Sequence, residues 1–215
     1  MTVDEGYIKY DIDWTPGPAP DVDTTRELDT WRQRLFAAGL IGEYADLGVG
    51  YGNISKRAGA AGQFLISGTQ TGHLQTTTAE HYALVTAVDV DANRVSCCGP
   101  VKASSEAMTH AAIYALDERI EAVVHVHSKA LWDRYIGELP TTDSAIAYGT
   151  PGMAREFARL YAECGFDRVG IAIMAGHDEG IVSFGHSLEA AAQRVLSLVP
   201  PEEQERVRSG TSGTP

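Results

Sequence analysis

The sequence has little cysteine, little basic charge and no long apolar run, and each shortage excludes a class of protein. Its three cysteines, Cys97, Cys98 and Cys164, do not form the disulfide framework of a small secreted domain. With 17 lysines and arginines against 29 aspartates and glutamates, the chain has no basic stripe to neutralise the phosphates of a nucleic acid or an anionic membrane. No stretch of about 18 apolar residues would cross a membrane, and residues 1–6 lack the segments of a secretion signal. These absences predict a cytoplasmic protein that binds neither nucleic acid nor membrane.

The chain does have enough apolar material for one domain. It has 215 residues, of which 44% are hydrophobic, and this suffices for one substantial core but is cramped for two. Strand-like and helix-like segments alternate along it, which favours an α/β class. Residues 1–23 are rich in Asp, Pro and Gly and predict an extended arm. A domain is expected over residues 24–200, followed by a polar, disordered tail over residues 201–215.

Capping residues and periodicity set the expected helices and strands. Thr24 and Glu27 form a capping box that predicts a helix over residues 24–38. Ser104 and Ser105 precede a helix that should run to residue 116, with a serine as its N-cap. Further helices are expected over residues 129–137, from Thr150 to Cys164, and from Ser187 to Val199. The expected strands cover residues 64–66, 82–90, 94–98, 122–127, 171–174 and 181–184.

Two histidines stand at alternate positions in the β-branched run of residues 123–128. In a strand, residues i and i+2 share one face and lie about 6–7 Å apart, so His125 and His127 can reach one metal ion. Val124 and Val126 would then face the core, which predicts a half-buried strand with a polar functional face. The alternative is a pair of surface histidines, because a metal needs more than two ligands.

His177 follows a buried-looking strand in a glycine-flanked turn, where a loop can present a side chain at the end of a sheet. With the two strand histidines it would leave a fourth coordination position open, as in a catalytic zinc site. Glu106 could fill that position or act as a base. His110 lies one helical turn after Glu106 and is expected to pack or to support a ligand rather than to bind metal. The remaining histidines, His73, His81 and His186, are interpreted as surface or loop residues.

Two segments are dense in glycine and small hydrogen-bond donors. Residues 47–55 carry three glycines at alternate positions before Asn53, and residues 67–72 have the sequence Ser-Gly-Thr-Gln-Thr-Gly. Glycine lets a backbone approach a ligand closely, so such loops can direct N–H groups at an anion. An ordinary turn explains the first segment equally well, and its spacing matches neither common nucleotide-binding motif. The helix start after Ser104 would also favour an anion, although simple capping accounts for the serines.

Five motifs occur in the order found in the class II aldolase/adducin family, at residues 52–55, 67–72, 104–106, 125–128 and 177–185. The chain resembles that family over residues 25–199. The resemblance implies a three-layer α/β/α fold with a central mixed, largely antiparallel sheet, and a homotetramer with each metal site near a subunit interface. It also implies one divalent metal per chain. Zinc is expected, with manganese, cobalt, nickel and iron left open, because a three-histidine set accepts several metals.

The family's functional residues can be carried over position by position. Its metal ligands match His125, His127 and His177, and its catalytic acid/base matches Glu106. The segments that bind the substrate phosphate match Asn53, Thr71, Gly72, Ser104 and Ser105. A second alignment would put Ser67 and Gly68 in place of Thr71 and Gly72. Ala103 stands where many sugar-phosphate members have proline, so a carboxylate is an alternative to phosphate.

The resemblance implies a metal-dependent lyase, an aldolase that cleaves or forms a carbon–carbon bond in a small phosphorylated or acidic sugar-like substrate through a metal-stabilised enediolate. Epimerases, dehydratases and decarboxylases of the family use the same chemistry, and the fold does not choose among them. A non-catalytic, adducin-like interaction domain is a further alternative, but the intact Glu106 and three histidines argue against it. Aldolases of the fuculose-phosphate type supply a tyrosine as a second acid, and here Asp143 or Tyr148 could substitute.

Overall fold

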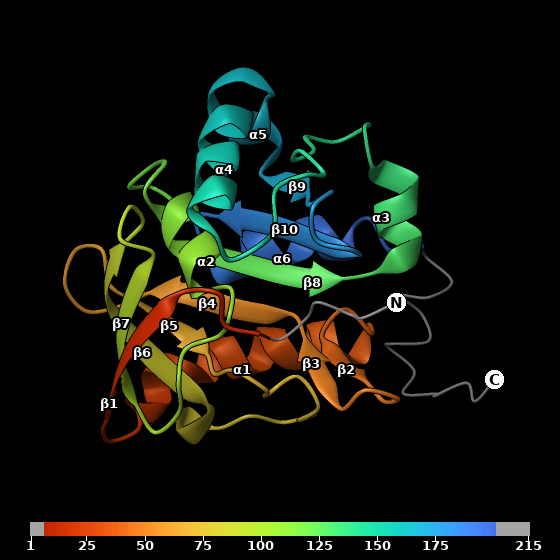
Figure 1. Ribbon diagram of the computed structural model, residues 1–215. Coiled ribbons are helices and arrows are strands. Elements are labelled where there is room, and N and C mark those ends of the chain that lie inside the picture. The colour runs from red at the N-terminus through yellow and green to blue at the C-terminus, as the bar shows by residue number, and fades with distance from the viewer. Residues whose placement is uncertain (1–6, 201–215) are drawn as a thin grey trace.

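An eight-stranded mixed sheet runs through the molecule (Figure 1). The computed structural model describes residues 7–200. The strands are β1 Asp11–Pro16, β2 Gly42–Tyr44, β3 Val49–Tyr51, β4 Asn53–Arg57, β5 Phe64–Ser67, β6 Tyr82–Asp89, β7 Arg94–Gly99, β8 Ala122–His127, β9 Ile171–Ile173 and β10 Gly180–Gly185. The helices are α1 Val22–Ala37, α2 Ala107–Tyr114, α3 Lys129–Tyr135, α4 Pro151–Glu163, α5 Phe166–Val169 and α6 Leu188–Leu196, with a 3-10 turn η1 at Ala79–His81.

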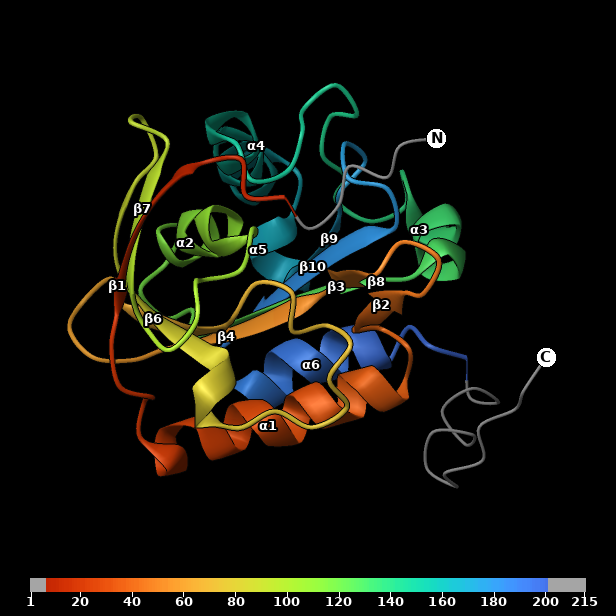
Figure 2. The same ribbon diagram turned by 60° about the horizontal axis from the view of Figure 1, so that its bottom comes forward.

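The strands of the large sheet lie in the order β1-β7-β6-β5-β4-β8-β10-β9, and β2 pairs with β3 in a separate hairpin. Strand β1 runs parallel to β7, and the other neighbouring strands are antiparallel. Helices cover both faces (Figure 2): α1 and α6 pack together on one, and α2 packs with α4 on the other. Each face has its own buried apolar cluster, one around Phe157 and the other around Leu28. The predicted three-layer α/β/α fold with a largely antiparallel mixed sheet is confirmed.

Strand β8 lies between β4 and β10. Val124 and Val126 face the cluster under α1 and α6, as the alternation predicts, while Val123 faces the cluster under α2. His125 and His127 therefore share the α2 side of the sheet with Val123. All the residues of β8 are buried, because helices cover both faces of the sheet here. The predicted half-buried strand, and its alternative of two surface histidines, were therefore wrong.

Two predicted helix starts were wrong, and each was displaced by a local hydrogen bond. Helix α1 begins at Val22, because the Asp21 side chain accepts from the backbone N–H groups of Asp23 and Thr24 at 2.9 and 3.2 Å. The capping box at Thr24 is therefore inside the helix. In α2 the N-cap position belongs to Glu106 rather than to a serine, and the Ser104 hydroxyl accepts from the Glu106 N–H at 3.3 Å.

The predicted caps of two later helices are confirmed. The Thr150 hydroxyl accepts from the Met153 N–H at the start of α4, and the Ser187 hydroxyl accepts from the Ala190 N–H at the start of α6. Helices α3 and α6 end a few residues earlier than predicted, at Tyr135 and Leu196. Helix ends fray, so their last residues are the least defined part of such a pattern.

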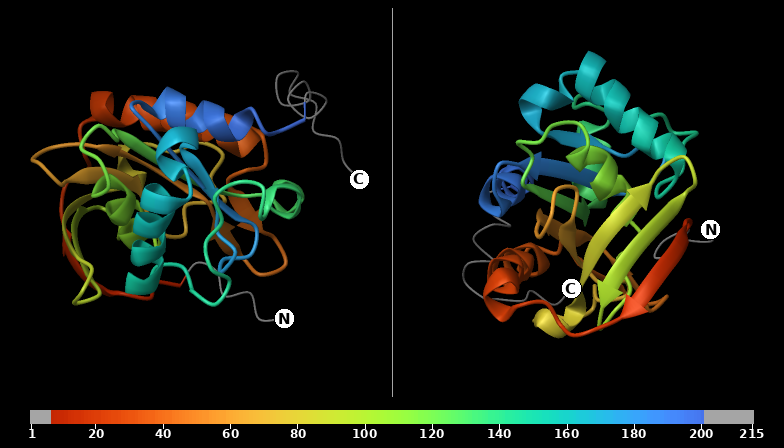
Figure 3. Two further views of the ribbon diagram at one scale, coloured as in Figure 1. Left: turned by 90° about the horizontal axis from the view of Figure 1, so that it is seen from above. Right: turned by 90° about the vertical axis from the view of Figure 1, so that its left-hand side faces the viewer.

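The predicted extended arm contains β1, which forms an edge of the chain's own sheet. The right-hand view of Figure 3 shows β1, β7 and β6 side by side. Exposed aspartates at positions 11 and 13 put charge on this edge, which opposes further strand pairing. Residues 1–6 of the arm and the predicted tail, residues 201–215, lie outside the described residues. Among residues 7–200, no helix is long and apolar enough to cross a membrane.

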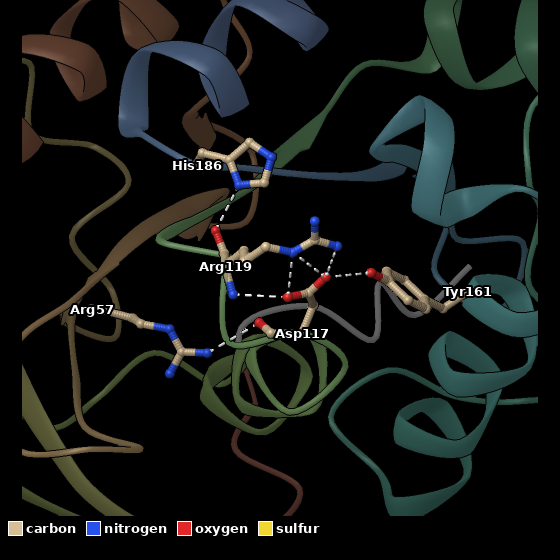
Figure 4. Close-up of polar contacts among 5 residues, drawn as sticks. All are labelled: Arg57, Asp117, Arg119, Tyr161 and His186. Carbon is tan, nitrogen blue, oxygen red and sulfur yellow. Dashed lines mark hydrogen bonds and ion pairs between the residues drawn. The ribbon is translucent and has the colours of Figure 1, made fainter.

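A cluster of polar side chains stabilises the loop that connects α2 to β8 (Figure 4). The Asp117 carboxylate accepts from the backbone N–H of Arg119 at 2.8 Å, from its guanidinium at 2.6–3.0 Å, and from the Tyr161 hydroxyl at 3.0 Å. Arg57 donates to the Asp117 backbone carbonyl, and His186 contacts the Arg119 carbonyl. The hydrogen bonds from Arg119, supported by Tyr161, hold the pKa of the Asp117 carboxyl below its usual range, against a smaller opposing effect of burial.

Asp117→Asn is expected to make folding stability less sensitive to acid. The pKa of Asp117 is lower in the folded than in the unfolded chain, so its stabilising effect is present above the unfolded pKa of about 3.9 and is lost as the pH falls towards the folded value. The variant should be less stable than wild type at about pH 7, and the difference should shrink below about pH 4. Urea unfolding across this range measures the difference. A difference that stays constant with pH would contradict the prediction.

Candidate metal centre and anion pocket

Three histidines, two on β8 and one in the turn between β9 and β10, converge on the α2 side of the sheet. His125 and His127 lie on β8, and Gly180 at the start of β10 pairs with His127, which brings the His177 turn beside them. One ring nitrogen from each histidine lies within 4.8 Å of the others, and the Nε2 atoms of His125 and His127 are 3.0 Å apart. All three side chains are buried. The structure therefore brings the three predicted metal ligands together.

Gly180 allows this close approach. A Cβ atom at this position would lie 3.1 Å from His177 Cγ and 3.3 Å from His125 Cε1, which is too close to both rings. The turn is fixed by hydrogen bonds from the His177 N–H to the Met174 carbonyl at 3.1 Å and from the Gly180 N–H to the His177 carbonyl at 2.9 Å. A side chain at residue 180 would therefore crowd both histidine rings.

The surroundings of His125 favour a neutral imidazole, the form that binds metals. Burial lowers the pKa of His125 well below its ordinary value, and His127, His177 and His110 lower it further, against an opposing effect of the Ile181 backbone. A neutral ring keeps a nitrogen lone pair for a cation. Nitrogen donors of this kind suit zinc and several other divalent ions, so the cluster could bind one.

Glu106 joins the histidines from the start of α2. Its side chain is 1% exposed, and its Oε1 lies 3.5 Å from His177 Nδ1. A carboxylate in this position can exchange a proton with a group bound beside the histidines, or it can complete a coordination shell. Both of the roles considered for Glu106 from the sequence require this proximity.

A small pocket gathers both glycine-rich segments against the serines that precede Glu106. It is lined by residues 50, 52, 53, 68–72, 104 and 105, which include every predicted anion-binding residue: Asn53, Thr71, Gly72, Ser104 and Ser105. A bridge between Gly68 and Ala103 holds the loop against the serines. Of the alternative pair, Gly68 lines the pocket as well, but Ser67 does not, and the Ser67 hydroxyl accepts from the Ile54 N–H at 3.2 Å. The geometry favours the alignment on Thr71 and Gly72.

Hydrogen-bonding groups, rather than charged side chains, line this pocket. Its lining residues include no lysine or arginine. Within residues 7–200 the buried side-chain oxygen of Asn53 has no hydrogen-bond partner, so it can accept a hydrogen bond from a bound group. Gly72 lies against the backbone of the β2–β3 hairpin, because a Cβ atom there would be 2.2 Å from the Gly42 carbonyl oxygen and 2.8 Å from Gly50 Cα. The loop is therefore held where only glycine fits.

Two residues that the sequence analysis did not single out hold the pocket together. Arg32, a buried cation in the apolar stripe of α1, donates to the carbonyls of Thr71 and Leu74 at 2.7 and 2.6 Å. The sequence could have indicated such a contact, because Arg32 lies among the apolar residues of α1 and a buried guanidinium needs hydrogen-bond acceptors. Tyr10, just before β1, donates to the Ser104 carbonyl at 2.6 Å, and nothing in the sequence marks that contact.

The structure separates the two candidates for a second acid. Tyr148 is buried, and its ring stacks on His177 with centroids 4.1 Å apart. Asp143 is exposed and accepts from the Ala145 N–H of its own turn at 2.8 Å. Tyr148 is therefore the candidate that contacts the histidine cluster.

The other histidines lie outside the cluster of three. His110 is buried, its Nδ1 lies 2.7 Å from the Ser55 hydroxyl, and burial lowers its pKa to about 3. His73 and His186 are exposed, and His81 is partly exposed with its Nδ1 accepting from the Thr78 N–H. These positions agree with the packing and surface roles predicted for them.

The family model for the class II aldolase and adducin N-terminal domain matches residues 37–199. A comparison with curated protein sequences finds no match. Among solved structures, L-fuculose 1-phosphate aldolase has a TM-score of 0.62 and 16% identity, over 89% of this chain and 97% of that chain. YgbL from Klebsiella pneumoniae, described as a candidate aldolase, epimerase or decarboxylase, has a TM-score of 0.61 and 21% identity, over 88% of this chain and 89% of that chain. A sugar-phosphate aldolase from Thermotoga maritima has a TM-score of 0.59 and 18% identity, over 89% of this chain and 97% of that chain.

At these identities the likeness to solved structures shows the fold alone. The family match rests on the sequence itself, and it extends from the end of α1 to beyond α6. It includes β8 and the turn between β9 and β10, which carry the histidine cluster, and all the residues that line the pocket. The chain therefore belongs to the class II aldolase and adducin N-terminal domain family.

Proposed function

We propose that the chain is a metal-dependent lyase of the aldolase type, which cleaves or forms a carbon–carbon bond in a small phosphorylated or acidic sugar-like substrate. One observation carries the proposal: three buried histidines and a buried glutamate converge next to a pocket lined by hydrogen-bonding groups. A domain that served only as an interaction surface would have no need to bury these groups together, because burying ionisable side chains costs free energy. Membership of the family supports the same function class.

In this proposal His125, His127 and His177 hold one divalent ion. Zinc is the favoured metal, because three nitrogen donors with an open fourth position suit it, and manganese, cobalt, nickel and iron are alternatives. When bound, the ion supplies Lewis-acid stabilisation of the negative charge that develops next to a carbonyl group. The predicted homotetramer and cytoplasmic location stay predictions.

Glu106 is proposed to move the proton. Its carboxylate is buried and lies 3.5 Å from His177 Nδ1, so a substrate bound at the histidines would lie within its reach. It would take a proton from the substrate as the carbon–carbon bond breaks and return it to the product carbon. Its backbone N–H at the start of α2 donates to the Ser104 hydroxyl, which helps to fix its position.

The anionic end of the substrate is proposed to lie in the pocket lined by Asn53, Thr71, Gly72, Ser104 and Ser105. The Asn53 amide, the serine hydroxyls and backbone N–H groups would bind it. The pocket adjoins the first turn of α2, where the helix dipole favours negative charge. Phosphate and carboxylate both satisfy these donors, so both substrate classes belong in the test.

The test is a screen of sugar phosphates and sugar acids for release of an aldehyde. Metal-loaded protein should release an aldehyde from one substrate class, lose this activity after treatment with a chelator, and recover it when zinc is added back. Consumption of a substrate without aldehyde release would favour the epimerase, dehydratase or decarboxylase alternative. A protein that binds metal and turns over no member of the panel would favour the non-catalytic interaction domain.

A further inference from the structure

The two ring nitrogens of His127 face different partners. Nε2 lies 3.0 Å from Nε2 of His125, towards the centre of the histidine cluster. Nδ1 lies on the other side of the ring, 3.0 Å from the hydroxyl oxygen of Tyr44 on β2. A histidine binds a metal through a nitrogen lone pair, and the hydrogen bond made by its other nitrogen decides which nitrogen keeps that lone pair.

The direction of the hydrogen bonds around Tyr44 follows from counting hydrogens. The Tyr44 hydroxyl also contacts Oε2 of Glu179 at 2.9 Å, and it is the donor in that contact. A tyrosine hydroxyl has one hydrogen, so towards His127 its oxygen can only accept. Nδ1 of His127 must then carry the hydrogen, and the lone pair is left on Nε2, the nitrogen that faces His125.

Glu179 makes this contact from an unfavourable backbone conformation. Its φ angle is +66°, in the left-handed region where residues with a Cβ atom are disfavoured. The Glu179 carbonyl accepts from the Ser128 N–H at 3.1 Å, which ties the His177 turn to the residue that follows His127. Glycine would adopt this φ without strain, yet the chain has a residue whose carboxylate reaches Tyr44. Strain of this kind is characteristic of functional positions.

Tyr44 and Glu179 line an open groove that borders the outer side of His127. In such a groove water can also bind the outer nitrogen of an imidazole, and water supports either tautomer because it donates as well as accepts. A partner that can only accept a hydrogen bond supports one tautomer alone. Because the Tyr44 hydroxyl donates its only hydrogen to Glu179, the Tyr44 oxygen is such a partner for His127.

We propose that Tyr44 and Glu179 are positioning residues for the metal site: together they hold His127 in the tautomer and orientation that direct its Nε2 lone pair at the other two histidines. Neither residue touches the metal in this arrangement. The inference rests on the proposed metal site, and it adds two residues outside the three ligands and Glu106. Partners of this kind usually change metal affinity by roughly 10- to 100-fold when they are removed.

The test is the dissociation constant for Co²⁺, measured on metal-free protein by visible absorption with a competing chelator. Tyr44→Phe and Glu179→Ala should each bind Co²⁺ roughly 10- to 100-fold more weakly than wild type, because alanine leaves no acceptor for the Tyr44 hydrogen. The double variant should be little weaker than either single variant, because both substitutions break one chain of hydrogen bonds. Tyr51→Phe is the matched control: its ring centroid lies 5.5 Å from that of His127, but its hydroxyl donates to the Gly39 carbonyl. This control should bind Co²⁺ as wild type does.

Glu179→Gly separates positioning from a general loss of structure. It removes the carboxylate and relieves the positive φ angle, so it should unfold at a urea concentration no lower than Glu179→Ala does and still bind Co²⁺ more weakly than wild type. Wild-type affinity in Tyr44→Phe and in both Glu179 variants would overturn the positioning proposal and leave the metal site standing. A wild-type protein that binds no Co²⁺ would overturn the metal site itself.

Discussion

His177→Ala is expected to leave a folded protein that no longer retains a divalent ion. The substitution removes the one histidine of the cluster that does not come from β8, and two imidazoles from a single strand give too few ligands to hold an ion tightly. Elemental analysis of untagged protein should find roughly one divalent ion per chain in wild type and almost none in the variant. Aldehyde release should disappear with the ion.

The control is His73→Ala, which removes an exposed histidine outside the cluster and should leave the metal content unchanged. Near-ultraviolet circular dichroism would show whether His177→Ala keeps its fold, since the ring it loses stacks against Tyr148. Equal metal content in wild type and His177→Ala would show that the ion binds elsewhere in the chain. A wild-type protein that contains no divalent ion and does not bind added zinc, manganese or cobalt would contradict the metalloenzyme proposal.

The parts of the site that the sequence predicted are those fixed by local geometry. The two β8 histidines fall on one face because any strand alternates its side chains, whatever it pairs with. His177 could be expected at a sheet end because glycines flank it between two apolar runs. Local spacing does not show how the two segments meet. That depends on the pairing of Gly180 with His127, and the five family motifs supplied the missing connection.

The parts that the sequence missed depend on contacts between segments far apart in the chain. The glycine-rich stretch at residues 47–55 suggested a loop or turn, but it contains β3 and the start of β4. Glycine has a low intrinsic strand preference, and here β3 exists because it pairs with β2, while Gly50 lies against Gly72, where neither position has room for a side chain. The contact of Arg32 with the loop at residues 71–74 is likewise invisible to any short sequence window.

Glu106→Gln is expected to lower kcat for carbon–carbon cleavage by roughly 10²- to 10⁴-fold, the usual contribution of a positioned acid/base group. Glutamine keeps the volume of the buried side chain and does not alter the backbone N–H that bonds Ser104, so the start of α2 should keep its shape. It cannot take up and return a proton. KM should change little, since the proposed anion pocket is formed by other residues. Steady-state kinetics on the substrate identified by the screen measures both constants.

Glu163→Gln, at the exposed end of α4, is the control for the same chemical change away from the site and should leave kcat unaltered. Metal content distinguishes the two roles considered for Glu106. A variant that keeps its ion and loses kcat has lost a proton carrier, whereas a variant that loses the ion has lost a ligand. If Glu106→Gln kept both its ion and its kcat, the proton would have to move through another group. Tyr148, stacked on His177, would then be the next residue to replace.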